Sequence, residues 1–247
     1  MVFKPEITHR WFPVDRVISE HSVKLENYWI YKLGNDDNVH ITDFGLEEKG
    51  AVAKWDVTFN NNDRLNIEVA YQDLTLLEDF DPTRVQEDDI FLLAGNRYIN
   101  YFFSSQIRTD QRKIFSYTIK PFIGKFFEGL RTGIEGSVTY RYQPYGSVSV
   151  NVNYNHIRLD MPYETTNLWL IGPRIDFTFS KKVFLTTFIQ YNNQLDNLNI
   201  NSRFQWRFAP VSDFFLVYTD NFSTDPFDQY TSRNRALVAK LTYWLNL

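Results

Sequence analysis

Regular alternation of apolar and polar residues is the feature that most limits how this chain can fold. In residues 198–210, apolar side chains alternate with Asn, Arg and Gln, and Ser202 is the one small residue at an apolar position. A period of two describes a β-strand with two unlike faces. The alternation recurs along the chain, in residues 54–59, 64–72, 130–143, 147–155, 169–179 and 237–247. The sequence therefore predicts an all-β protein.

The connections between these runs are of two alternating kinds. Short turns are expected at residues 60–63, 109–111, 144–146, 181–182 and 209–212. The others vary: 75–90, 160–166 and 222–232 are long, whereas 34–38, 128–129 and 196–197 are tight. One rim of short turns is typical of outer-membrane barrels, and many runs exceed the roughly 9–11 residues that cross a bilayer. We expect an antiparallel transmembrane β-barrel of about 13–14 strands, as a single domain over residues 1–247.

Composition is compatible with this expectation. The chain is 17% aromatic, its mean hydropathy is −0.38, and its net charge of −4 gives no general case for nucleic-acid binding. The absence of cysteine excludes disulfides and thiolate sites. We expect a bacterial outer-membrane location and no cofactor.

The apolar faces carry many aromatic residues near their ends, as the headgroup-level girdles of membrane barrels do. Phe204 and Trp206 are therefore expected to face lipid, and Arg203, Gln205 and Arg207 the lumen. The expected girdle comprises Trp55, Phe59, Tyr142, Trp169, Phe179, Trp206, Phe208 and Trp244. A soluble β-protein that buries these faces is the alternative.

Basic residues predominate on the expected lumen face of the C-terminal half, where only Glu135 and Asp176 oppose them. This basic stripe comprises Arg112, Lys120, Arg131, Arg141, Arg174, Arg203, Arg207 and Lys240. One interpretation is an anion-attracting pore, or a dock for an acidic ligand or plug. The other, which is the more common arrangement, is a set of cross-strand ion pairs and solvated wall residues.

Acidic residues gather in the variable loops, at Glu78, Asp79, Asp81, Glu87, Asp88 and Asp89 and at Asp220, Asp225 and Asp228. Divalent cations bind such oxygen clusters, but the Asp-x-Asp-x-Asp-Gly spacing is absent, which favours solvated loop acids. His156 invites comparison with lipases that act in a barrel wall, yet no serine follows at their spacing. The histidines at 9, 21, 40 and 156 do not cluster in the sequence, so we expect neither a catalytic site nor a metal site.

The segments TTFIQYNNQLDNLNINSRFQWRFAPVSDFFLVYTDN and NRALVAKLTYWLNL resemble the C-terminal outer-membrane barrel region of the DUF5916 family. The resemblance covers most of the chain from about Val23 onward. Family members place a domain similar to carbohydrate-binding-module family 9 before the barrel. The resemblance implies an outer-membrane barrel and brings no established reaction.

Strand parity predicts that the chain is a fragment. If the final strand ends in the periplasm, residues 4–12 run downward, and an upward strand is missing or comes from another chain. The WFPVD of residues 11–15 resembles the turn FAPVSD at 208–213, which favours a periplasmic turn there. The alternating final strand is the kind of signal that barrel-assembly machinery reads.

From these observations we predict a non-enzymatic outer-membrane barrel that acts as a pore or as an anchor and scaffold in an envelope assembly. Its expected partners are outer-membrane lipid, lipopolysaccharide, the assembly machinery and other envelope proteins, without nucleic acid. A soluble or surface carbohydrate-binding β-protein is the alternative. A lipid-modifying enzyme that uses His156 is the third hypothesis.

Overall fold

The computed structural model describes residues 1–14, 16–32, 45–83, 92–160, 163, 165–224 and 231–245. All regular secondary structure in these residues is β-strand, so the all-β prediction is confirmed. The strands are β1 (Val2–Phe3), β2 (Glu6–Trp11), β3 (Ile18–Lys32), β4 (Gly45–Phe59), β5 (Arg64–Thr75), β6 (Arg97–Arg108), β7 (Phe115–Phe126), β8 (Gly129–Tyr142), β9 (Gly146–Arg158), β10 (Thr166–Ser180), β11 (Val183–Asn192), β12 (Asn197–Ala209), β13 (Ser212–Ser223) and β14 (Ser232–Thr242). Within the described ranges, no helix is long and apolar enough to cross a membrane.

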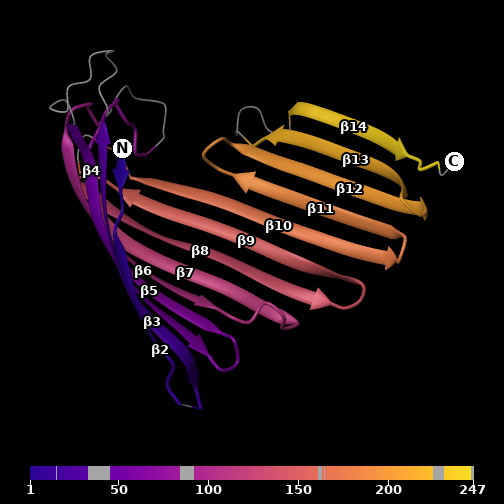
Figure 1. Ribbon diagram of the computed structural model, residues 1–247. Coiled ribbons are helices and arrows are strands. Elements are labelled where there is room, and N and C mark those ends of the chain that lie inside the picture. The colour runs from indigo at the N-terminus through magenta and orange to yellow at the C-terminus, as the bar shows by residue number, and fades with distance from the viewer. Residues whose placement is uncertain are drawn as a thin grey trace. The chain divides into compact units, whose positions relative to one another are not determined.

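The strands form one antiparallel sheet in which β3 to β14 follow one another in chain order (Figure 1). β1 and β2 both pair with β3 at the beginning of this order. Between the described strands, no backbone pairing joins β1 or β2 to β14, so hydrogen bonds do not close the sheet. The predicted antiparallel strands and their approximate number are confirmed.

The connections agree in part with the lengths that the sequence predicts. Tight turns join β8 to β9, β10 to β11 and β12 to β13, whereas the β5–β6 connection spans residues 76–96. The β6–β7 turn covers residues 109–114, which is longer than predicted. Asn62 and Asp196 have positive φ angles of 63° and 43° in their turns, which Asn and Asp adopt more readily than most residues. The expected tight turn at 34–38 lies outside the described residues.

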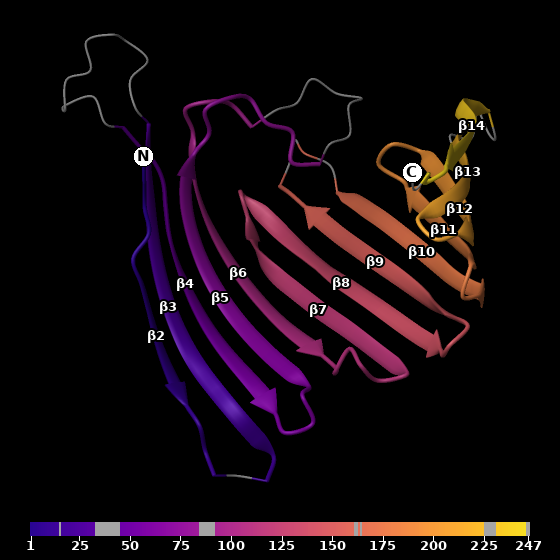
Figure 2. The same ribbon diagram turned by 45° about the vertical axis from the view of Figure 1, so that its right-hand side comes forward.

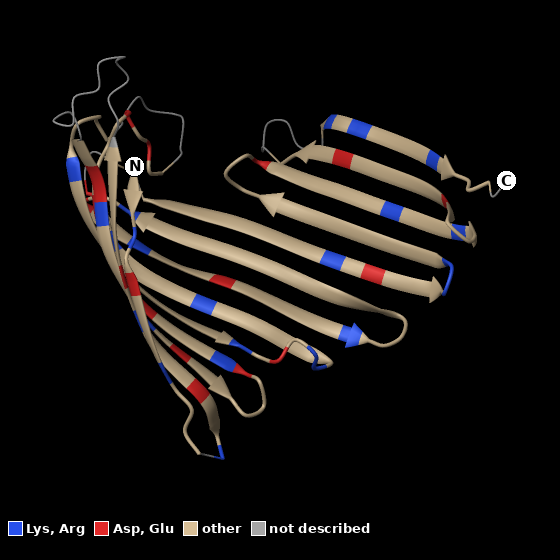
Figure 3. Ribbon diagram, viewed as in Figure 1, with Lys and Arg blue, Asp and Glu red and all other residues tan. Residues whose placement is uncertain are grey.

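The chain divides into two compact units. Unit 1 comprises residues 1–110, 119–134 and 155–167, and unit 2 comprises residues 111–118, 135–154 and 168–247. Strands β2 to β6 of unit 1 lie side by side as long ribbons (Figure 2). Charged residues of both signs occur along the strands (Figure 3), and Glu47, Glu48 and Lys49 are consecutive on β4.

The register of unit 2 separates the alternating residues onto two faces. Phe204 lies opposite Leu185 on β11 and Leu216 on β13, whereas Arg203 lies opposite Thr186. Because cross-strand partners share a face, unit 2 has an apolar face and a polar face. The apolar face carries Ile171, Ile175, Phe177, Val183, Leu185, Ile189, Leu198, Ile200, Phe204, Trp206, Phe214, Leu216, Leu237 and Leu241. The polar face carries Arg174, Asp176, Thr186, Gln190, Asn199, Asn201, Arg203, Gln205, Arg207, Asp213, Thr219 and Lys240.

Unit 1 repeats this division. Trp55 lies opposite Val23 and Ile67 on its apolar face, while Lys54 lies opposite Glu68 on its polar face. Other members of the apolar face are Leu25, Leu65, Val69, Tyr71, Ile99, Tyr101, Phe103 and Ile107. Other members of the polar face are Lys24, Glu26, Glu48, Asp56, Arg64, Asn66, Gln72, Asn100, Ser104, Gln106 and Arg108.

Burial on β6 of unit 1 is the reverse of that in a water-soluble sheet. On β6 the apolar-face residues Tyr101 and Phe103 are 53% and 46% exposed, while the polar-face residues Asn100 and Ser104 are 1% and 6% exposed. Large exposed apolar surfaces of this kind mark interaction or membrane sites.

Candidate functional site

The apolar face of unit 2 carries aromatic residues toward both ends of its strands. At the short-turn end, Phe177 lies 4.8 Å from Phe179 and Trp206 lies 5.6 Å from Phe208, between ring centroids. At the other end, the ring of Trp169 lies 4.1 Å from that of Tyr154. Six predicted girdle residues belong to this unit: Tyr142, Trp169, Phe179, Trp206, Phe208 and Trp244, the last just beyond the end of β14. Trp55 and Phe59 belong to β4 of unit 1.

A buried carboxylate interrupts each apolar face near its loop end. In unit 2, Asp220 is fully buried and accepts hydrogen bonds from Tyr218 Oη at 2.6 Å, Ser232 Oγ at 2.7 Å and Arg235 Nε at 2.6 Å. The prediction that Asp220 lies in a variable loop is wrong, because the residue lies within β13. Its neighbours there, Asp225 and Asp228, lie outside the described residues.

Unit 1 contains the same arrangement. Asp73 is 3% exposed and accepts from Tyr71 Oη at 3.1 Å and from Arg97 Nε at 2.6 Å. In both units a Tyr-x-Asp pair on one strand meets an Arg of the next strand. We call each set a Tyr–Asp–Arg triad: Tyr71, Asp73 and Arg97 in unit 1, and Tyr218, Asp220 and Arg235 in unit 2.

A hydrogen-bonded row, the polar belt, crosses the polar face of unit 1. Tyr28 Oη and Gln72 Nε2 both donate to Glu48 Oε1, at 2.8 Å and 2.9 Å. Asn100 Nδ2 donates to Gln72 Oε1 at 3.2 Å, and Asn100 Oδ1 accepts from the backbone N–H of Phe127 at 2.6 Å. Five elements are joined in this way, because the residues belong to β3, β4, β5, β6 and the β7–β8 turn. The polar belt was not predicted, because the positions of its residues relative to one another depend on strand register.

A small hydrophobic cluster lies at the loop end of unit 1. Leu92, Tyr98 and Phe127 form its buried centre, and Phe80 and Tyr163 pack against it. A backbone bridge between Phe80 and Leu92 holds the two described parts of the β5–β6 connection together. Burial raises the pKa of Tyr163, because ionising the phenol there would leave a charge with little access to water.

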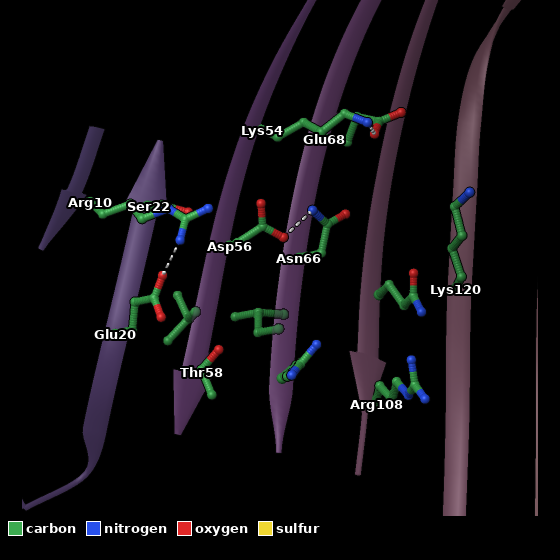
Figure 4. Close-up of a pocket in the computed structure, with 14 residues that line it drawn as sticks. Arg10, Glu20, Ser22, Lys54, Asp56, Thr58, Asn66, Glu68, Arg108 and Lys120 are labelled. Carbon is green, nitrogen blue, oxygen red and sulfur yellow. Dashed lines mark hydrogen bonds and ion pairs between the residues drawn. The ribbon is translucent and has the colours of Figure 1, made fainter. Parts of the chain in front are cut away.

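A pocket of about 630 Å³ opens on unit 1 at the short-turn end of its polar face. Its charged lining residues are the basic Arg10, Lys54, Arg64, Arg108 and Lys120 and the acidic Glu20, Asp56 and Glu68. Figure 4 shows Lys54 beside Glu68, whose Nζ and Oε2 atoms are 2.8 Å apart, and Asp56 beside Asn66, which donates to it over 2.9 Å. Arg10 Nη1 is 3.8 Å from Glu20 Oε1.

The predicted basic stripe divides between the two units. In unit 1, Lys120 lines the pocket, and Arg131 donates to Asn155 Oδ1 and covers the rings of Phe122 and Phe126. The other six belong to unit 2: Arg112 in the β6–β7 turn, and Arg141, Arg174, Arg203, Arg207 and Lys240 on strands.

Two residues of the stripe in unit 2 form ion pairs, one within strand β10 and one across strands β12 and β13. Arg174 makes a two-pronged contact with Asp176, at 2.8 Å and 3.0 Å. Arg207 Nε is 3.4 Å from Asp213 Oδ1. Asp213 is therefore a third acid on this face. It was predicted to lie in the turn at residues 208–213, so it was not counted among the acids of the polar face.

Two of the acidic loop residues that the structure describes, Asp79 and Asp81, have local partners. Asp79 accepts from the backbone N–H of Ala94, and Asp81 accepts from both donors of Thr83. Glu87, Asp88 and Asp89 lie outside the described residues. Among the described residues, no group of three or more His, Asp and Glu side chains could hold a metal ion.

The histidine prediction requires a correction. Register brings His21 opposite Trp11, so the Trp11 ring stacks on His21 at 4.9 Å and meets the edge of His9 at 4.3 Å. His9 and His21 thus share one aromatic cluster. His156 stands apart, with its Nδ1 2.8 Å from Asn167 Oδ1, and His40 lies outside the described residues.

No protein-family model, curated protein or solved structure matches this chain. The resemblance to the DUF5916 barrel region therefore stays a prediction.

Proposed function

We propose that the protein is a non-enzymatic outer-membrane β-barrel, with its apolar faces toward lipid and its polar faces lining the interior. The observation that carries this proposal is the exposure of Tyr101 and Phe103 beside the burial of Asn100 and Ser104 on a single strand. In water such a sheet would expose its apolar face at a large free-energy cost. In a bilayer the same face lies in its preferred solvent.

The spacing of the aromatic residues fits a bilayer. Trp169 and Phe179 lie ten residues apart on the apolar face of β10. At about 3.4 Å per residue this is roughly 34 Å along the strand. A tilt of about 45° reduces the height to about 24 Å, close to the ~25 Å apolar band between the aromatic girdles of such barrels.

Strand direction limits how the barrel would close. In the antiparallel order, β2 and β14 run in the same direction. Direct pairing between them would be parallel, and an antiparallel closure takes one further strand. Closure is needed because unpaired backbone groups are costly in hydrocarbon.

The interior of the proposed barrel is polar, which suits a pore or a scaffold for an envelope assembly. The polar belt and the pocket of unit 1 both lie on this side. Outer-membrane lipid would be the main partner of the apolar face. The exposed alternating residues of β14, Leu237 and Leu241, fit a strand that barrel-assembly machinery reads.

The absence of cysteine makes a direct test possible, because every introduced thiol is unique. Single variants Phe204→Cys and Arg203→Cys place labels on opposite faces at adjacent positions. After reconstitution, a spin label at Phe204→Cys should collide with oxygen in lipid, and one at Arg203→Cys with an aqueous nickel chelate. On a denaturing gel, unheated and heated samples of the wild-type chain should also migrate at different positions.

A soluble monomer without detergent, together with aqueous collisions at both positions, would overturn the membrane proposal. Saturable glycan binding by that soluble monomer would favour the carbohydrate-binding alternative.

A further inference from the structure

The polar face of unit 1 contains two arginines that face each other without a counter-charge. Arg64 begins β5 and Arg108 ends β6, and they are direct cross-strand partners. Directly opposed residues have Cβ atoms about 4.5–5.5 Å apart, and like charges at such positions are destabilising. In the described part of the chain, neither guanidinium has a hydrogen-bond or ion-pair partner. Both residues are exposed, so water surrounds the two guanidinium groups and the pair is open to a ligand from solution.

A like-charged pair elsewhere on this face is neutralised. Lys24 and Lys54 are also direct partners, but Lys24 contacts Glu6 and Glu26, and Lys54 contacts Glu68. The carboxylates of the pocket are engaged elsewhere: Glu68 with Lys54, Glu20 with Arg10 and Asp56 with Asn66. No carboxylate of the pocket is therefore assigned to Arg64 or Arg108.

We propose that this pocket binds a phosphate-bearing ligand, whose phosphate group lies between Arg64 and Arg108. Each guanidinium presents parallel N–H donors that match two oxygens of one anion. A carboxylate has only two oxygens and satisfies one such fork, whereas a tetrahedral dianion has enough oxygens for both. Lys120, from β7, adds a third positive charge to the pocket lining, and Thr58, opposite Arg64, adds a hydroxyl (Figure 4).

This proposal goes beyond the barrel proposal and does not depend on it. The phosphate would neutralise a repulsion within the sheet, so binding and stability are coupled. In the absence of ligand, removing one arginine should relieve the repulsion and leave stability unchanged or higher. In the presence of ligand, the same change should abolish the stabilisation that the ligand gives to wild type. A residue with a purely structural role would not produce this reversal of the effect on stability.

The test titrates the folded chain with inorganic phosphate. Calorimetry measures the affinity, and the urea midpoint of unfolding measures the stabilisation by phosphate. Sulfate is the second tetrahedral probe, and nitrate at matched ionic strength is the monovalent control. Wild type should bind phosphate saturably, with nitrate at least tenfold weaker. Arg64→Gln and Arg108→Gln should each bind phosphate at least tenfold more weakly.

The predicted reversal of the effect on stability is tested with three variants. Without phosphate, Arg64→Gln should unfold at a midpoint equal to or above that of wild type; with phosphate, only wild type should shift upward. Arg203→Gln, on the polar face of unit 2, should keep wild-type binding. Arg64→Lys, which keeps the charge and loses the two-pronged geometry, should bind with intermediate affinity.

Three results would overturn the phosphate site: no saturable binding by wild type, equal binding of nitrate, or unchanged affinity in both glutamine variants. None of them alters the gel-shift and spin-label results, so failure of this site and failure of the barrel proposal are distinguishable.

Discussion

Arg235 donates a hydrogen bond from Nε to Oδ2 of Asp220 over 2.6 Å, on the apolar face of unit 2. Arg97 and Asp73 form the same contact in unit 1. A carboxylate on an apolar face is costly unless its oxygens are hydrogen-bonded. Each triad therefore holds an acid that the surrounding sheet could not otherwise accommodate.

Asp220→Asn should lower the free energy of unfolding, because a neutral amide cannot replace the ion pair and offers one acceptor oxygen to three donors. The measurement is urea unfolding in lipid or detergent, combined with Arg235→Gln in a double-mutant cycle. The two changes should be strongly non-additive, since both remove the same contact.

Asp213→Asn is the matched control for the triad. Its carboxylate contacts Gln205 and Arg207 on the polar face, where water can replace lost partners. An equal loss of stability in Asp213→Asn and Asp220→Asn would show that the apolar setting of the triad has no special effect.

Gly124→Ala should destabilise unit 1 by about 1–3 kcal/mol, the usual cost of forcing atoms into a packed site. A Cβ at Gly124 would lie 2.3 Å from the carbonyl oxygen of Tyr101, which is backbone and cannot rotate away. Gly45→Ala is the control, because no atom lies within 4 Å of its added Cβ. Equal denaturation midpoints for the two variants would contradict this account of Gly124.

Asn100→Ala should cost about 1–3 kcal/mol, because it leaves the backbone N–H of Phe127 without its acceptor in a buried position. Hydrogen exchange at Phe127 should accelerate in the same variant. Asn199→Ala removes only a side-chain contact of 3.3 Å on the polar face of unit 2 and should change stability little. Slow exchange at Phe127 in Asn100→Ala would show that the polar belt does not protect this turn.

We expect Tyr163 to make the free energy of unfolding depend on pH in the alkaline range. Burial raises its pKa in the folded protein, so folding favours the neutral phenol. Its contribution to stability is fully present below the ordinary tyrosine pKa of about 10 and falls as pH rises through the folded value. The stability difference between wild type and Tyr163→Phe, measured at pH 8 and near pH 11, should therefore decrease with pH. A constant difference would mean that Tyr163 does not ionise differently on folding.

The sequence was sufficient for the strand class and for the two faces. Alternation around Phe204 and Arg203 predicted opposite sides, and the register of β11 to β13 places them there. This success has a simple cause: side-chain direction in a strand depends only on residue parity.

Residue parity does not determine which residues become neighbours across strands. Asp220 resembled a loop acid because it interrupts the apolar series of β13, and its partner Arg235 lies on another strand. Arg64 and Arg108 are separated in sequence by the whole β5–β6 connection. Both relationships depend on register, which turn geometry and pairing decide.

From β3 to β14, each strand pairs with its neighbours in sequence. Each new ribbon therefore needs only a local loop closure, and the entropy lost per closure grows slowly with loop length. Growth can proceed by adding one hairpin at a time to an existing edge, without waiting for distant segments to meet. A meander of this kind can be lengthened or shortened by whole hairpins while the rest keeps its pairing.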